Sequence, residues 1–226
     1  MRRRVVWIVA GVAALVVGAA VVDSLVRMQT EDRIASEVTA IPGIETEPGV
    51  TIGGFPFLTQ LAAGSLQRVR LTAPTATVEG LLLEDVVVEL TGVLTEEPYT
   101  ASDATMTART TADAVEEVLT VELDLEVRDD VLVATTDVLG LPLDVVLLPQ
   151  AAGRDVQVDV TGFRLAGLGV SADALPADLM ATLQGLRFSL DGLPVGMTLT
   201  EVEVADGALS LRAEGADLDL ATVALP

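Results

Sequence analysis

The side chains able to do chemistry in this sequence are carboxylates, hydroxyls and arginines. The 226 residues include no histidine and no cysteine, and all 13 basic residues are arginine. An imidazole base, a Ser-His-Asp triad, a thiol nucleophile, a thiolate metal site and a Schiff-base lysine are therefore excluded. Carboxylates recur at every second position in three segments, which contain Glu122, Asp124 and Glu126, then Glu201 and Glu203, and finally Asp217 and Asp219.

Carboxylates at such spacing could serve two kinds of reaction. A glycosidase holds two of them at a set separation, and Asp217-Leu218-Asp219 has the spacing of a metal–nucleotide pair in some glycosyltransferases. No nucleotide-binding βαβ pattern, Gly-rich phosphate loop, Gly-x-Ser-x-Gly elbow or calcium loop accompanies them. Acids that alternate with apolar residues usually form the solvated face of a strand. We therefore expect a protein that is not an enzyme and needs no metal or cofactor, with a carboxylate-based glycan hydrolase as the least favoured alternative.

The charge distribution narrows the possible partners. The net charge is −21, of which residues 1–28 contribute +3, so the remaining chain carries −24. An acidic body of this kind repels nucleic acid, which excludes a nucleic-acid function. Apolar residues make up 50% of the sequence but aromatic residues only 3%, so valine, leucine and alanine must fill the core.

The N-terminus has the pattern of an export signal or a membrane anchor. Arg2-Arg3-Arg4 precedes 18 uncharged residues, Val5 to Val22, and a helix of that length rises about 27 Å, enough to cross a hydrocarbon core. The segment could be a signal peptide cut near Gly18-Ala19-Ala20, or an uncleaved anchor. Either interpretation divides the chain into residues 1–22 and an extracytoplasmic domain at 23–226.

The remaining sequence predicts one helix and then a strand-rich domain. Residues 23–41 read as a helix that Pro42-Gly43 ends. Residues 121–127 alternate apolar and acidic side chains, as a half-buried antiparallel strand does. Short helices are expected from Asp113 to Leu119 and over 175–183. Further strands are expected at 66–73, 82–94, 131–138, 143–148, 155–165, 187–193, 197–205 and 208–220.

Several strands change the parity of their apolar residues midway. The changes fall after Gly162, between Leu199 and Val202, and after Gly215. Because side chains alternate across a strand, each change requires a bulge, a bend or a division into two short strands. We expect an α+β fold in which a long, strongly coiled antiparallel sheet wraps one or two helices, although two short strands at each place are also compatible with the pattern.

The most distinctive local sequence runs from Val50 to Leu61 and contains Phe55-Pro56-Phe57. Two of the four phenylalanines of the chain lie here, and Pro56 holds the preceding residue extended. Thr59 can open a turn or short helix that carries Gln60 and Leu61. One interpretation is a hydrophobic plug that closes one end of the sheet. The other is the mouth of an apolar cavity, or a tip that dips into a bilayer.

Residues 52–64 resemble the hallmark motif of the LmeA-like phospholipid-binding proteins of the cell envelope of high-GC Gram-positive bacteria. The overall plan over residues 20–226 is similar too: an apolar segment, a helix, the motif, then strands with two interposed helices. The resemblance implies a fold similar to tubular, BPI-like lipid-binding domains, with a groove for acyl chains. It also implies phospholipid binding outside the cytoplasmic membrane and, for some members, a role in mannan or lipoglycan elongation.

The leading hypothesis is therefore a phospholipid-binding or lipid-transfer protein at the outer face of the cytoplasmic membrane. The main alternative is a structural scaffold that docks a membrane glycosyltransferase. Aliphatic, deformable walls with few polar groups suit acyl chains. No lipid contact carries over from the family residue by residue, so the candidates are apolar side chains of the motif, the two short helices and the remaining aromatic positions: Phe55, Phe57, Leu58, Leu61, Leu119, Phe163, Leu175, Leu179, Met180, Leu183 and Phe188.

Overall fold

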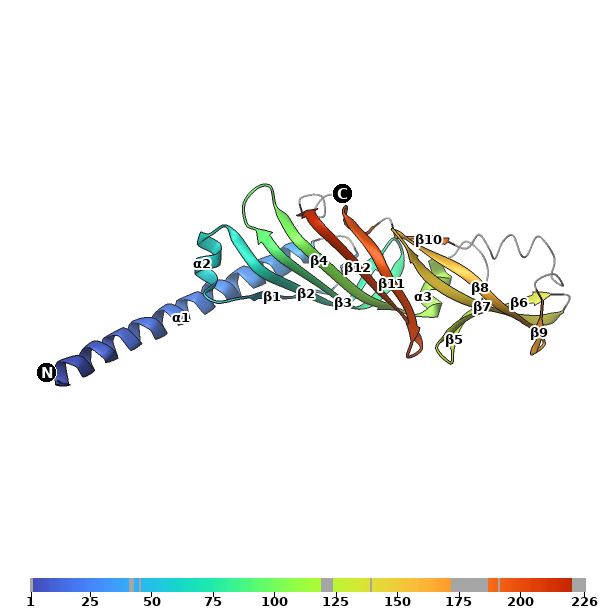
Figure 1. The fold of residues 1–226 in the computed structure, drawn as a ribbon, viewed down its shortest axis with the longest axis horizontal. Coiled ribbons are helices and arrows are strands. Elements are labelled where there is room, and N and C mark those ends of the chain that lie inside the picture. The colour runs from blue at the N-terminus through green and yellow to red at the C-terminus, as the bar shows by residue number, and fades with distance from the viewer. Residues whose placement is uncertain are drawn as a thin grey trace.

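A computed structural model gives the fold of the chain (Figure 1). For 2–16, 138, 187 and 188 only the backbone is described. The described residues are 2–40, 43–44, 46–118, 124–138, 140–171, 187–190 and 192–220.

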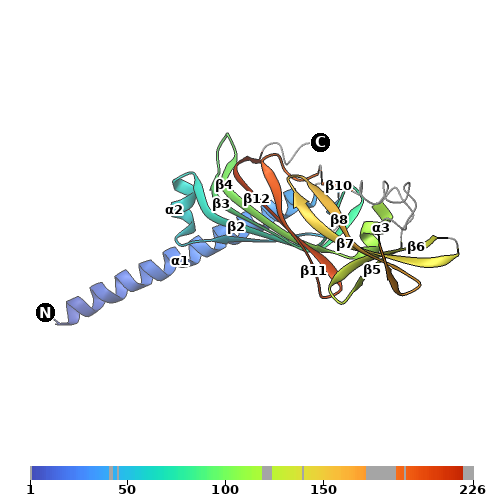
Figure 2. The same cartoon turned by 45° about the vertical axis from the view of Figure 1, so that its right-hand side comes forward.

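A single long helix, α1 (Arg2–Thr39), opens the chain. The apolar segment and the helix expected at 23–41 are thus one element, because no proline interrupts the sequence before Pro42. Figures 1 and 2 show that the N-terminal part of α1 projects from the body, while its C-terminal part runs along the sheet. Within the part of the chain that the structure describes, no helix combines the length and the apolar character needed to cross a membrane.

The first of two antiparallel sheets follows α1. Its strand order is β1-β2-β3-β4-β12-β11, so the last two strands of the chain complete it. The short helix α2 (Phe57–Ala62) connects β1 to β2. The strands are β1 (Gly49–Gly53), β2 (Ser65–Val78), β3 (Leu81–Leu94), β4 (Thr100–Thr110), β11 (Met197–Ala205) and β12 (Ala208–Asp219).

The second sheet lies at the far end of the elongated molecule from α1 (Figure 1). Its order is β10-β8-β7-β6-β5, with β9 also paired to β8. Helix α3 (Ala112–Val118) leads from the first sheet into the second. The strands are β5 (Asp124–Arg128), β6 (Val131–Val138), β7 (Leu141–Ala152), β8 (Asp155–Leu165), β9 (Leu168–Val170) and β10 (Arg187–Ser189).

Two-residue turns set the register of several hairpins. Asp129-Asp130 joins β5 to β6, and Asp206-Gly207 joins β11 to β12; all four residues have positive φ, between 52° and 76°. Turns of this hand match the twist of the flanking strands. The two turns also meet, because the backbone N–H of Asp206 donates to Asp130 Oδ1 at 3.1 Å.

The parity changes predicted from the sequence lie within continuous strands, not between pairs of short ones. The β7–β8 register shifts between Val146 and Leu147, opposite the Gly162 region. The β11–β12 register shifts between Leu199 and Glu201. In β12, Asp217 has a φ of 51°, and Ala213 and Leu218 are buried on either side of the change. At each irregularity the strand changes which of its alternating residues, odd-numbered or even-numbered, face the core.

The interior is a row of apolar clusters lined by small and aliphatic side chains. One cluster covers the inner face of the first sheet, and a second covers that of the second sheet. Helix α3 lies between them, with Ala114 in the first cluster and Ala112 in the second. A third cluster joins α1 to β1 and β2. The fold is α+β and mostly antiparallel sheet, as expected. That the sheet is strongly coiled and wraps a helix stays a prediction.

Candidate functional site

The motif after β1 is held against α1 by two acidic side chains of that helix. Asp23 is buried, and its two carboxylate oxygens accept the backbone N–H groups of Phe57 at 3.0 Å and Leu58 at 2.8 Å. Glu31 Oε1 accepts the N–H of Ile52 at 2.7 Å. Helix α2 has Pro56 at its N-cap and no side-chain cap of its own. Asp23 therefore supplies from another helix the anionic cap that the first turn of α2 needs.

The corner before α2 depends on Gln60 and Gly54. Gln60 Nε2 donates to the carbonyl of Gly53 at 3.2 Å, and Gln60 Oε1 accepts the N–H of Gln67 at 2.8 Å. Gly54 has a φ of +93°, and a Cβ there would lie 2.6 Å from Gln60 Nε2. Any other residue at position 54 would thus have a strained backbone conformation, and its side chain would displace Gln60. The motif is a fixed corner whose polar groups bond to one another.

The two phenylalanines of the motif have opposite environments. The Phe57 side chain is fully buried, beside Ile52, in the cluster that joins α1 to the first sheet. Phe55 is 70% exposed, and Leu58 and Leu61 on α2 are also exposed. The plug interpretation therefore fits Phe57. The interpretation as an exposed apolar tip fits the other three.

A second apolar feature is a cleft of about 360 Å³ where the edge strand β11 meets the second sheet. Its polar groups are few: Asp130, Thr161 and Glu203. This is the composition expected of a lipid site, at the lower end of the volumes of small-molecule pockets, about 300–1,000 Å³. The apolar part of the lining comes from β6, β7 and β11: Val131, Leu132, Val146, Leu147, Leu148, Pro149, Val202 and Val204.

Among the described residues, few backbone hydrogen bonds join the two sheets beside this cleft. The N–H of Leu199 donates to the carbonyl of Gly153 at 2.6 Å, in an isolated bridge between the sheets. The guanidinium of Arg154 donates to the carbonyls of Leu193 and, at 3.1 Å, Pro194. These contacts fix the first residues of β11 and the segment before it, and thereby one wall of the cleft. The turn that follows β11 is held by the hydrogen bond from the Asp206 N–H to Asp130 Oδ1. Between these points the wall is lined by aliphatic side chains.

The structure describes the side chains of five of the predicted lipid-contact residues. Phe55, Leu58 and Leu61 are exposed at the α2 end, whereas Phe57 and Phe163 are buried in the core. Leu119, Leu175, Leu179, Met180 and Leu183 lie outside the described residues, and only the backbone of Phe188 is described, in β10. Sequence reasoning missed the cleft, although the run Val145-Val146-Leu147-Leu148-Pro149 is apolar at both parities. Such a run is typical of a strand that is covered on both faces.

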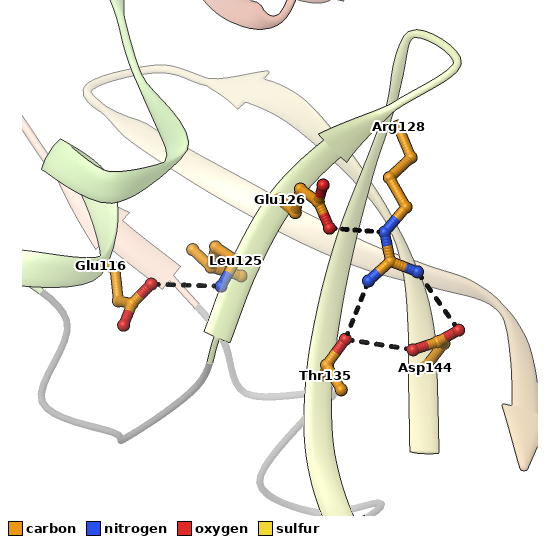
Figure 3. Close-up of polar contacts among 6 residues, drawn as sticks. All are labelled: Glu116, Leu125, Glu126, Arg128, Thr135 and Asp144. Carbon is orange, nitrogen blue, oxygen red and sulfur yellow. Dashed lines mark hydrogen bonds and ion pairs between the residues drawn. The ribbon is translucent and has the colours of Figure 1, made fainter. Parts of the chain in front are cut away.

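The acidic face of β5 forms surface ion pairs. Arg128 bonds Glu126 on its own strand and, across the sheet, Asp144 and Thr135, as Figure 3 shows. The hydrogen bond with Glu126 is the main cause of a raised pKa of Arg128; attraction to Glu126 and Asp144 adds to it, and desolvation opposes it. The guanidinium therefore stays charged and neutralises its neighbours. Among the described residues, no cluster of acidic side chains could hold a metal ion.

Comparison with known proteins identifies the family. A family model described as LmeA-like phospholipid-binding matches residues 21–214. The chain belongs to this LmeA-like family. No curated protein and no solved structure matches it. The matched range begins just before Asp23 and ends within β12, so the clamped motif and the cleft both belong to the LmeA-like domain.

Proposed function

We propose that the protein binds a phospholipid without catalysing a reaction, and that the cleft between β11 and the second sheet holds an acyl chain. The observation that carries the proposal is an aliphatic cleft with few polar groups, in a chain of a phospholipid-binding family. Transfer of each methylene from water contributes about 0.8 kcal/mol. An acyl chain of ordinary length can therefore bind without any specific polar contact, before the losses due to ordering and to leaving a bilayer.

The proposal places the protein outside the cytoplasmic membrane, in the cell envelope. Arg2-Arg3-Arg4 and the uncharged run after them support export, with residues 1–22 acting as a cleaved signal or as an anchor. The lipid would be taken up at the outer face of that membrane. By binding this lipid, the protein would transfer lipid or support mannan or lipoglycan elongation, as the sequence resemblance suggests. The same proposal includes a coiled sheet that encloses the lipid tails.

Leu148→Asp tests the cleft. Leu148 lines the cleft and is 48% exposed, so an aspartate there should be tolerated by the fold while placing a charge against the acyl chain. Leu82→Asp is the matched control, because Leu82 is 41% exposed and lies on β3, away from the cleft. We expect native mass spectrometry to find co-purified phospholipid with the unchanged chain and with Leu82→Asp, and at least a tenfold loss with Leu148→Asp.

The same measurement separates the alternatives. A chain that carries no lipid and takes none up from phospholipid vesicles would favour the scaffold that docks an envelope glycosyltransferase. Equal lipid content in both aspartate variants would refute the cleft as the site. A hydrolase would lose activity on envelope glycans when single carboxylates, such as Glu203, are changed to amides with the fold retained.

A further inference from the structure

Exposed apolar side chains gather at one end of the body. Phe55 is 70% exposed, and Leu58 and Leu61 on α2 are 38% and 40% exposed. On α1, which leaves the body here, the exposed apolar residues are Val17, Val21, Val22, Leu25 and Met28. Apolar patches on soluble surfaces usually mark an interaction site.

The two sets of residues lie on neighbouring elements. Asp23 joins α1 to the start of α2 through its two hydrogen bonds. Figures 1 and 2 agree that α2 sits at the end of the body from which α1 projects. The face of α1 turned toward the body and α2 carries Asp23, Val26 and Ile34, whereas Leu25 and Met28 lie on the opposite face of the helix. The carboxylate clamp holds Phe55, Leu58 and Leu61 beside the place where α1 leaves the body, and these three side chains are here called the α1–α2 surface.

Charge distinguishes this end from the rest of the molecule. Residues 23–72 contain six acidic and four arginine side chains, a net charge of −2, whereas residues 73–226 contain 28 acidic and six arginine side chains, a net charge of −22. Arg68 is exposed on β2, which follows α2 directly, whereas Arg70 forms an ion pair with Glu89 of β3 at 3.0 Å. An anionic bilayer therefore repels the segment that contains α2 less than it repels the rest of the chain. The acidic hairpin with Glu96 and Glu97 borders α2, since Thr95 N–H donates to the Gly64 carbonyl at 3.0 Å, and marks the limit of the surface.

We propose that the α1–α2 surface docks on the interfacial region of a phospholipid bilayer, with Phe55 and Leu58 entering the headgroup–acyl boundary. Aromatic and leucine side chains on the apolar side of a helical surface bind in this way. Docking keeps the body at the membrane with its acidic sheets turned away. The proposal deepens the function proposed above by naming the surface that meets the membrane, and it stands whether or not the cleft holds the lipid.

The absence of cysteine makes a direct test possible. Single cysteines in the full chain, Phe55→Cys, Leu61→Cys and Leu168→Cys, would each carry one environment-sensitive fluorophore. Leu168 is the control, because it is 74% exposed and lies in the second sheet, at the far end of the molecule. With vesicles of equal parts phosphatidylcholine and phosphatidylglycerol, we expect the labels at 55 and 61 to shift to the blue and to be quenched by brominated acyl chains. The label at 168 should do neither.

A second substitution tests whether the surface acts as a unit. Leu58→Asp, combined with the label at position 55, should return the emission toward its value in water, whereas Leu168→Asp should not change it. Circular dichroism confirms that each variant is folded. Emission at 55 that matches emission at 168 in the presence of vesicles would overturn the proposal. Concentration-dependent self-quenching at 55 without vesicles would overturn it too, since the surface would then be an interface with a second copy of the chain.

Discussion

The α1–motif corner and the cleft at the β11 junction are held by opposite means. At the corner, hydrogen bonds to Asp23, Glu31 and Gln60 hold the end of β1, the start of α2 and the start of β2 around a fully buried Phe57. At the junction, Leu199, Arg154 and Asp206 supply hydrogen bonds between the sheets, and valines and leucines line the cleft between them. Directional bonds specify one geometry, whereas aliphatic walls tolerate several. The difference suits the roles proposed above, in which the corner meets the membrane and the cleft accepts an acyl chain.

The largest effect is expected from Phe57→Ala. Removing a fully buried phenylalanine leaves a cavity beside Ile52 and should lower the free energy of unfolding by about 3–5 kcal/mol. Phe55→Ala, two residues away, is the control and should change it by no more than about 0.5 kcal/mol because Phe55 is exposed. Chemical denaturation of both variants measures the contrast. Similar losses for the two phenylalanines would show that the corner does not divide into a plug and a tip.

Asp23→Ala should have the next largest effect. It leaves the N–H groups of Phe57 and Leu58 without an acceptor, and should destabilise the corner by about 2–3 kcal/mol. Asp32→Ala, on the exposed side of the same helix, should be close to neutral. Hydrogen exchange should accelerate at residues 57 and 58 in the first variant only. Unchanged protection there would mean that Asp23 is not the cap of α2.

The smallest effect is expected from Arg154→Ala, at the junction. The carbonyls of Leu193 and Pro194 lose their donors but can turn to water, so the loss of stability should be about 1–2 kcal/mol. Faster exchange of the Leu199 amide would report a loosened wall of the cleft. Arg154→Lys keeps the charge and serves as the comparison. A loss as large as that of Phe57→Ala would contradict the view that packing holds this junction.

Strong alternation predicted much of the sheet. The strands at 131–138, 155–165 and 197–205 have the bounds expected from the sequence, because their valines and leucines contrast sharply with flanking acids. The strand β4 was missed because its inward residues, such as Ala101, Ala104 and Ala108, differ little in hydropathy from the threonines between them. Its threonine content, favourable to strands, was the available signal. The short strands β1 and β9 were missed as well.

The site was less predictable because it depends on contacts between distant segments. The motif was recognised from residues 52–64, but its clamp was not, since Asp23 lies 34 residues before Phe57 and reads in the sequence only as the end of an apolar run. The cleft joins β6 and β7 to β11, which no local pattern places together. Apolar periodicity shows which face of a strand is buried, but not which strand of another sheet covers it.

The position of Asp23 bears on the proposed cleavage of the N-terminal segment. A peptidase that cuts at Gly18-Ala19-Ala20 removes nearly half of α1 but spares both carboxylates that hold the corner, because Asp23 and Glu31 lie downstream of the cut. The cleaved and the anchored forms would then share one folded body and differ only in whether the N-terminal part of α1 is present. A recombinant form that starts beyond Asp23 would lack the cap, and a start at or before Ala20 is the safer choice.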